Sequence, residues 1–154
     1  MAFLTPIRIL AYGSALFTYM LIVVGGIVSA TPGAGLSCPD WPLCKGQLVP
    51  PLEGPVVIEY VHRLLAATVT VLVFLTMSYA ATRLKDHRDV VALSTASFLL
   101  VVSQVILGMV TVRTQLSPVA VTAHLGLASG VFALLIANAM TVRNLRVDEG
   151  RLID

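Results

Sequence analysis

The sequence has few charged and few aromatic residues: Asp, Glu, Lys and Arg make up 12% of its 154 positions, and Phe, Trp and Tyr make up 6%. A soluble globular domain normally carries about 25% charged residues, so this class is excluded. Ten Lys and Arg residues against eight Asp and Glu leave a net charge of only +2, which excludes the basic face that nucleic-acid binding requires. Intrinsic disorder is excluded as well, because it requires low hydrophobicity together with high net charge.

Hydrophobic residues are abundant instead, at 57% of the chain, and the mean hydropathy is +0.91. A hydrocarbon core about 30 Å thick is crossed by a helix of roughly 20 apolar residues. Nearly uncharged stretches of sufficient length occupy residues 8–30, 56–82, 90–113 and 117–142. We therefore predict an all-α, polytopic membrane protein, a single four-transmembrane-helix bundle over residues 1–154 with an outer loop over residues 31–55.

The basic residues predict how the bundle is oriented. One side of the predicted bundle has the larger set, Arg8, Arg83, Lys85, Arg88, Arg143, Arg146 and Arg151, and the other side has Lys45, Arg63 and Arg113. Because the side richer in Lys and Arg stays in the cytoplasm, we expect both termini to be cytoplasmic and the protein to lie in the cell membrane. The alternative is a cleaved signal peptide over residues 1–30, but its apolar region of about 22 residues would exceed the usual 7–15.

Two histidines occupy equivalent places in the second and fourth predicted helices. His62 and His124 each lie about two turns from the outer helix end, so both reach the same depth in the membrane. Ionisable residues in a span usually face the bundle interior, and two imidazoles at matched depth can bind haem iron from opposite sides. We predict a b-type or related haem, with iron held by His62 and His124. One alternative is that each histidine forms a hydrogen bond to a neighbouring helix. Another is a zinc site, but zinc prefers four ligands, and only Glu59 lies at the same depth as the two histidines.

Glu59 lies three residues before His62 and therefore on the same helix face. A carboxylate one turn from a haem ligand can exchange a proton at the edge of the macrocycle, which makes Glu59 the candidate catalytic residue. The alternative is an interfacial ion pair with Arg63, four residues later. Arg63 and Arg113 are candidates for binding haem propionates, because guanidinium groups match carboxylate geometry, although interfacial arginines are also common membrane anchors.

Cys38 and Cys44 are the two cysteines of the chain, and both lie in the predicted outer loop. An oxidising compartment favours a disulfide between them, and a pair that cycles through a thiol–disulfide exchange protein is the alternative. Trp41, between them, can anchor the loop at the lipid headgroups or cover a haem pocket. Glycines in the predicted helices indicate either close helix packing or clearance for a macrocycle beside His124, and the pattern does not separate the two.

Four motifs in this order resemble the haem A synthase family. They are Cys38-Pro39-Asp40-Trp41-Pro42-Leu43-Cys44, Glu59-Tyr60-Val61-His62-Arg63, Gln104-Val105-Ile106-Leu107-Gly108 with Thr111-Val112, and His124-Leu125. The resemblance implies oxidation of the C8 methyl of haem O to the formyl group of haem A by successive hydroxylations. It also implies that Glu59 is the catalytic carboxylate, that His62 and His124 coordinate the haem, and that Cys38 and Cys44 form the outer-loop disulfide.

Familiar members of that family have eight helices in two similar halves, each with its own His pair, and this chain resembles the half with the Cys loop and the Glu. We therefore expect a homo-oligomer, a partner that supplies the second haem site, or a protein that handles a single haem. The expected partners are haem O and membrane lipid, with haem O synthase, terminal oxidase assembly factors and a thiol–disulfide exchange protein as further candidates. The alternative function is a non-catalytic bis-His membrane cytochrome that binds or transfers haem or electrons, for which Glu59 would be unnecessary.

Overall fold

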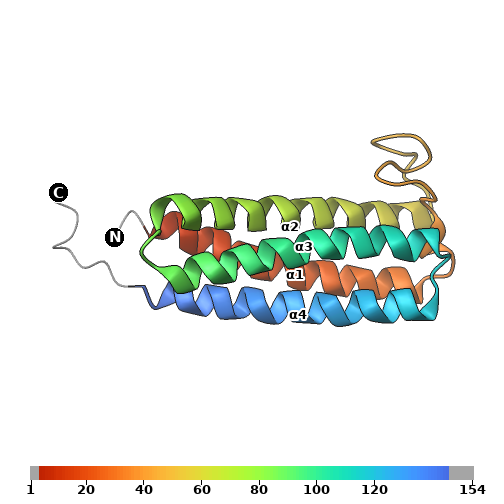
Figure 1. The fold of residues 1–154 in the computed structure, drawn as a ribbon. Helices are drawn as coiled ribbons and strands as arrows, with labels where there is room; N and C mark the ends of the chain where they lie inside the picture. Colours follow the sequence, from red (N-terminus) through yellow and green to blue (C-terminus); the bar gives the residue numbers. More distant parts are fainter. Residues whose placement is uncertain (1–3, 146–154) are drawn as a thin grey trace.

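Residues 4–145 are described by the computed structural model, and they form a bundle of long helices (Figure 1). The elements are α1 (Thr5–Ala30), the short 3-10 helix η1 (Ala34–Leu36), α2 (Pro55–Arg83), α3 (Arg88–Arg113) and α4 (Pro118–Arg143). Each long helix packs against the next along the chain, and α4 closes the ring by packing against α1. Consequently α2 and α4 lie diagonally across the bundle, as do α1 and α3. The prediction of an all-α four-helix fold is confirmed.

The helix ends differ slightly from the apolar stretches read from the sequence. α1 begins at Thr5 rather than at residue 8, and α3 begins at Arg88 rather than at residue 90. A helix continues beyond the apolar run because charged side chains such as those of Arg8 and Arg88 can extend toward water while the backbone stays helical. Proline in the first turn of α1, α2 and α4 fits the helix start, where its missing N–H leaves no hydrogen bond unmade.

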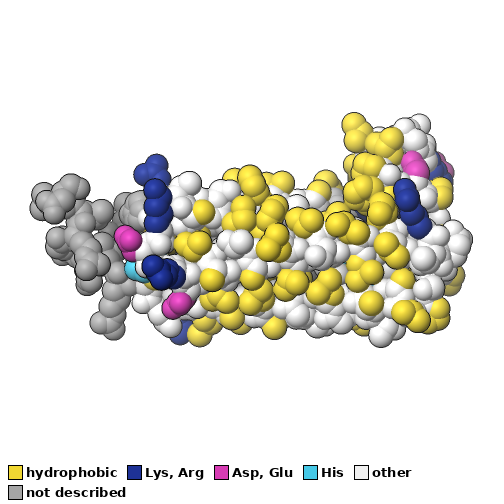
Figure 2. Space-filling model, viewed as in Figure 1, with side chains coloured by type: hydrophobic (Ala, Val, Ile, Leu, Met, Phe, Trp, Pro, Cys, Tyr) yellow, Lys and Arg dark blue, Asp and Glu magenta, His cyan; other side chains and the backbone are white. Residues whose placement is uncertain are grey.

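All four helices are long and apolar enough to cross a membrane, so the chain is a multi-pass membrane protein. Figure 2 shows Lys, Arg, Asp and Glu side chains only at the two ends of the visible face. We call the end with the α2–α3 turn the terminal end, because α1 begins and α4 finishes there (Figure 1). At that end the guanidinium of Arg8 donates to the carbonyls of Arg143 and Leu145 at 3.2 and 3.1 Å. Arg146 and Arg151, which contributed to the predicted orientation, lie outside the described residues.

The apolar core fills the terminal end and the middle of the bundle. Its first cluster comprises Leu4, Ile7, Ala11, Ala80, Leu84, Val90, Ala139 and Val142. Its second cluster comprises Ala15, Val69, Val73, Val101, Val131 and Leu135. Two buried polar pairs join adjacent helices within this core, Ser14 with Thr76 at 3.3 Å and Asn138 with Ser94 at 3.0 Å. Such hydrogen bonds fix the register of helices that share an apolar surface.

The opposite end, the loop end, is packed differently. There the chain between α1 and α2, residues 31–54, forms the Cys loop, in which Cys38 and Cys44 make a buried cluster with Val56 of α2. Between this cap and the core, the described residues of all four helices are only partly buried or exposed. These segments are residues 19–30, 60–68, 102–110 and 121–130. The loop-end part of the bundle therefore has no closed apolar core of its own, and it is here that His62 and His124 lie.

Candidate functional site

His62 and His124 are held at the same depth by two diagonally opposed helices. α2 begins at Pro55 and α4 at Pro118, so both histidines lie roughly 10 Å along the helix from its loop-end start, at about 1.5 Å per residue. The two imidazoles are near enough to interact electrostatically. The equal depth expected from the spacing is therefore present in the fold, and the two rings lie across the bundle from each other.

Each of the two imidazole rings has one nitrogen atom without a hydrogen-bond partner among the residues that the structure describes. The Nδ1 atoms of His62 and His124 are buried and accept or donate no hydrogen bond within residues 4–145. Leaving a buried polar atom unpaired is costly in an apolar medium, so both rings are suited to a ligand that pairs them. Among the described residues there is no group of three or more His, Cys, Asp and Glu side chains that could hold a metal ion. Two imidazoles and no third ligand match an iron whose remaining positions are filled by a porphyrin.

Gln104 of α3 supports the position of His124. Its Nε2 donates a hydrogen bond of 2.7 Å to the backbone carbonyl of His124, while its Oε1 is buried without a partner in the described part of the chain. Gln104 belongs to one of the motifs that carry the resemblance, but the sequence alone assigned it no role. The sequence signal that could have identified Gln104 is a polar amide side chain within an otherwise apolar helix.

Glu59 is buried at the loop end of α2, with 3% of the residue exposed. Its Oε2 accepts hydrogen bonds from the Ser37 hydroxyl and the Cys38 N–H, each at 3.0 Å. Its Oε1 accepts one from the Arg63 guanidinium at 2.6 Å. The ion pair that the spacing offered as an alternative is thus present, and Oε1 still has a lone pair available for a further donor. Ser37, which the sequence did not single out, is part of this network.

Arg63 ties the Cys loop to α2. Beyond Glu59, its guanidinium donates to the carbonyls of Asp40 and Leu43, both at 2.6 Å, and of Cys38 at 2.5 Å. These donors are directed at the loop, so a propionate could reach Arg63 only by replacing some of these acceptors. Arg113, the other candidate for propionate binding, lies exposed in the last turn of α3.

The Cys loop is closed by the predicted disulfide between Cys38 and Cys44, which the structure confirms. The carboxylate of Asp40 accepts the backbone N–H groups of Lys45 at 2.6 Å and of Gly46 at 2.7 Å. The hydrogen bond from Gly46, supported by that from Lys45, holds the pKa of Asp40 below its ordinary value. Trp41, at the tip between the cysteines, is 43% exposed.

This arrangement predicts a pH-dependent difference between the protein and an Asp40→Asn variant. Because the pKa of Asp40 is lowered by folding, its carboxylate stabilises the loop above its unfolded pKa, and the stabilisation is lost as pH falls through the folded pKa. At neutral pH, the reductant tris(carboxyethyl)phosphine should therefore open the disulfide of Asp40→Asn about twofold faster, a small effect because the carboxylate is accessible to water. The two rates should converge under acidic conditions. Equal rates at neutral pH would contradict this role of Asp40.

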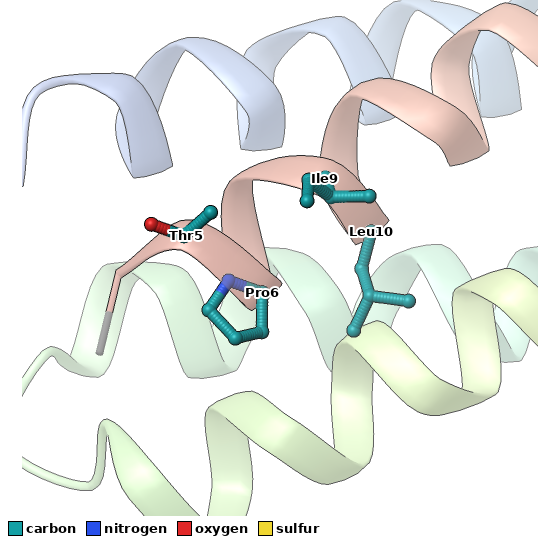
Figure 3. Close-up of a pocket in the computed structure, with 4 residues that line it drawn as sticks. All are labelled: Thr5, Pro6, Ile9 and Leu10. Carbon is teal, nitrogen blue, oxygen red and sulfur yellow. The ribbon is translucent and has the colours of Figure 1, made fainter. Parts of the chain in front are cut away.

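Two hollows on the helix surface lie away from the imidazoles. One is lined by Thr5, Pro6, Ile9 and Leu10 at the start of α1, at the terminal end of the bundle (Figure 3). The other is lined by Pro118, Val119, Thr122 and Ala123 on the outward side of α4. Neither of these two hollows is lined by a histidine or a charged side chain.

The chain is similar in sequence to known proteins and to a family model. A family model described as cytochrome oxidase assembly protein, COX15-CtaA, matches residues 8–152. A protein of Symbiobacterium thermophilum named heme A synthase is 35% identical over 129 residues, which cover 84% of this chain and 42% of that protein. The heme A synthase of Exiguobacterium sibiricum is 30% identical over 133 residues, covering 84% of this chain and 45% of the relative. This chain therefore spans less than half the length of these curated relatives.

Proposed function

The chain belongs to the COX15-CtaA family of cytochrome oxidase assembly proteins, and we propose that it acts in haem A biosynthesis as a membrane oxidoreductase. The proposed reaction is oxidation of the C8 methyl of haem O to a formyl group. The observation that carries the proposal is the pair of imidazoles at equal depth, each with a buried unpartnered nitrogen. One of the two, His62, lies one turn of helix from the buried carboxylate of Glu59. Relatives named heme A synthase support the same proposed function.

His62 and His124 are proposed to hold the haem iron, and Arg113 to contact a propionate at the loop end. The iron porphyrin supplies the oxidising chemistry when it is bound. The protein would orient the macrocycle between α2 and α4, in the part of the bundle where the helices are only partly buried. The closed core on the terminal side, including Val69 and Leu135, limits how deep the macrocycle can lie.

Glu59 is proposed to handle the protons that methyl oxidation releases. Its Oε1 has a lone pair available beside the Arg63 contact, and the carboxylate is anchored on its other oxygen by Ser37 and Cys38. These hydrogen bonds hold the carboxylate in place and leave one lone pair of Oε1 free to accept a proton. The Arg63 guanidinium, at 2.6 Å from Oε1, orients the carboxylate at the loop end of α2.

Pigment analysis of protein purified from cells that make haem O tests this function. The extracted haem, identified by chromatography and mass, should include haem A. Glu59→Gln, which preserves the shape of the side chain, should still bind haem but form haem A about 100-fold more slowly, the lower range for loss of acid–base catalysis. Glu53→Gln, a change at an exposed position of the Cys loop six residues before Glu59, is the matched control and should be unaffected. Haem b alone in the unmodified protein would favour the non-catalytic cytochrome instead.

We also propose that the protein lies in the cell membrane with both termini cytoplasmic. Arg8, Arg83, Lys85, Arg88 and Arg143 all belong to the terminal end of the bundle, which supports this orientation by the excess of positive charge on the cytoplasmic side. The Cys loop would then face the oxidising side, where a thiol–disulfide exchange protein could reach it. Haem O synthase and terminal oxidase assembly factors are the proposed neighbours that deliver the substrate and accept the product.

The 154-residue chain carries one such His pair, and we propose that two copies associate. Closed symmetric dimers are the commonest assembly of identical chains, and small residues such as Gly26 and Gly130, beside which a β-carbon would meet nothing within 4 Å, allow close approach of a second bundle. Native mass spectrometry in mild detergent should find a dimer with one haem per protomer. A stable monomer that converts haem O to haem A would refute the need for a second bundle.

A further inference from the structure

Each imidazole of the site packs against a glycine of the adjacent helix. A β-carbon placed on Gly25 of α1 would lie 3.1 Å from Cε1 and 3.6 Å from Nδ1 of His62. A β-carbon placed on Gly108 of α3 would lie 3.3 Å from Cε1 of His124. The two distances to Cε1 are shorter than ordinary van der Waals contact, so each ring occupies the space that a side chain at the glycine would need.

Other helical glycines do not share this environment. A β-carbon on Gly13, Gly26, Gly126 or Gly130 would meet nothing within 4 Å. At Gly25 and Gly108 the atoms within reach belong to the histidine rings and not to the backbone of a neighbouring helix. Close helix packing therefore does not account for these two glycines, whereas room for an imidazole does. Glycine is a poor helix former, so its presence in the interior of α1 and α3 calls for such a reason.

The two glycine–histidine pairs are arranged alike in the bundle. Gly25 and His62 belong to the hairpin of α1 and α2, while Gly108 and His124 belong to the hairpin of α3 and α4. Because the helices pack in a ring, the two pairs lie on opposite sides of the bundle axis (Figure 1). Each ring therefore lies against a stretch of helix backbone that carries no side chain, and the Nδ1 atom of each ring has no hydrogen-bond partner among the described residues.

We propose that Gly25 and Gly108 are positioning residues that set the planes of the His62 and His124 rings for binding iron. This inference rests on the proposed haem ligation. A methyl group at either glycine would displace its ring by a few tenths of an ångström or rotate it about χ2. Ligand geometry at a functional site generally has to be held within about 0.5 Å and 10–20°, so a shift of this size uses up most of the tolerance, and a ring rotation beyond it weakens the iron bond.

Four single substitutions test the proposal, each adding only a methyl group. Gly25→Ala and Gly108→Ala should lower haem affinity about tenfold and produce a high-spin fraction in the electron paramagnetic resonance spectrum, with a shifted reduction potential. Gly13→Ala and Gly126→Ala are the matched controls on α1 and α4, and both should keep the wild-type spectrum and haem content. Circular dichroism and size-exclusion chromatography establish that each variant is folded.

Repeating the Gly25→Ala substitution in a variant that lacks the His62 ring separates ring displacement from a general packing defect. In His62→Gly supplied with free imidazole, the ligand is no longer tied to α2 and can shift to accommodate a methyl group at position 25. Gly25→Ala should therefore lower haem binding in the wild-type background but have no further effect in the His62→Gly background. An equal loss in both backgrounds would mean that the methyl group acts on helix packing, and the proposal would be overturned.

The outcomes distinguish this inference from the function on which it rests. If the unmodified protein binds no haem, or binds it equally well without His62 and His124, the haem ligation itself fails. If the unmodified protein binds low-spin haem through these histidines, and Gly25→Ala and Gly108→Ala match it in spectrum, affinity and potential, the positioning role alone is refuted.

Discussion

Replacing His62 or His124 with alanine should remove most of the haem from the purified protein and convert the remainder from six-coordinate low-spin to high-spin. Each imidazole is proposed to supply one of the two axial ligands, and the described residues near them offer no third histidine or cysteine to take over. Loss of a partner that merely supports a metal ligand already costs 10–100-fold in affinity, so loss of the ligand should cost more than about 100-fold.

His87→Ala is the matched control for these two variants. His87 lies exposed in the turn between α2 and α3, at the terminal end of the bundle, so its removal should leave haem content and spectrum unchanged. Absorption and electron paramagnetic resonance spectra of all three variants, with the haem-to-protein ratio, provide the measurement. A wild-type spectrum in both His62→Ala and His124→Ala would show that the ligands are assigned to the wrong residues.

The architecture could be predicted from the sequence because a membrane places strict demands on it. Backbone groups in lipid must be hydrogen-bonded within the segment, so an apolar run of about 20 residues can hardly be anything but a helix. Proline at Pro55 and Pro118 then marks where helices begin. The exact ends could not be predicted to the residue, because a charged residue such as Arg88 is equally compatible with the first turn of a helix and with the connecting turn before it.

The depth of the histidines followed from counting residues along each helix, but the environment of Glu59 did not. Spacing within α2 offered both the ion pair with Arg63 and a free carboxylate. The choice depends on the path of the Cys loop, which brings Ser37 and Cys38 back onto α2 through η1. Contacts between a helix and an irregular loop have no period in the sequence, so the loop carbonyls around Arg63 could not be foreseen.

The role of the glycines could not be predicted from the sequence either. A glycine in a membrane helix favours close helix packing and clearance for a ligand about equally, because both need the absence of a side chain. Only the positions of the neighbouring atoms separate the two cases. Gly108 faces the ring of His124, whereas Gly126 and Gly130, only a few residues from His124 in the chain, face nothing within 4 Å.

Replacing Arg63 of α2 with methionine should strongly loosen the Cys loop. Methionine keeps much of the aliphatic length but removes the guanidinium that donates to Glu59 and to the carbonyls of Cys38, Asp40 and Leu43. The side chains of Arg63 and Glu59 are only 17% and 4% exposed. Breaking a buried ion pair from one side costs about 3–5 kcal/mol, since the remaining charge is left without compensation.

The rate at which tris(carboxyethyl)phosphine reduces the Cys38–Cys44 disulfide measures this loosening at the place where it occurs. If reduction requires the loop to open, a loss of about 3 kcal/mol corresponds to a rate more than about 100-fold higher. Arg113→Met, which removes an exposed guanidinium at the same end of the bundle, is the control and should have little effect. An Arg63→Met variant whose disulfide stays as protected as in the wild type would contradict the role of Arg63 as the tie between loop and helix.

Combining Arg63→Met with Glu59→Gln divides the effect between its two physical sources. If most of the loss comes from the uncompensated Glu59 carboxylate, neutralising it should restore much of the protection, and the two changes should be strongly non-additive. If it comes from the loop carbonyls that lose their donor, the double variant should reduce as fast as Arg63→Met alone. We expect partial restoration, because three of the four hydrogen bonds of Arg63 go to carbonyls and one to Glu59. Full additivity would mean that Glu59 and Arg63 act independently, and would separate the carboxylate proposed for proton transfer from the network that holds the loop.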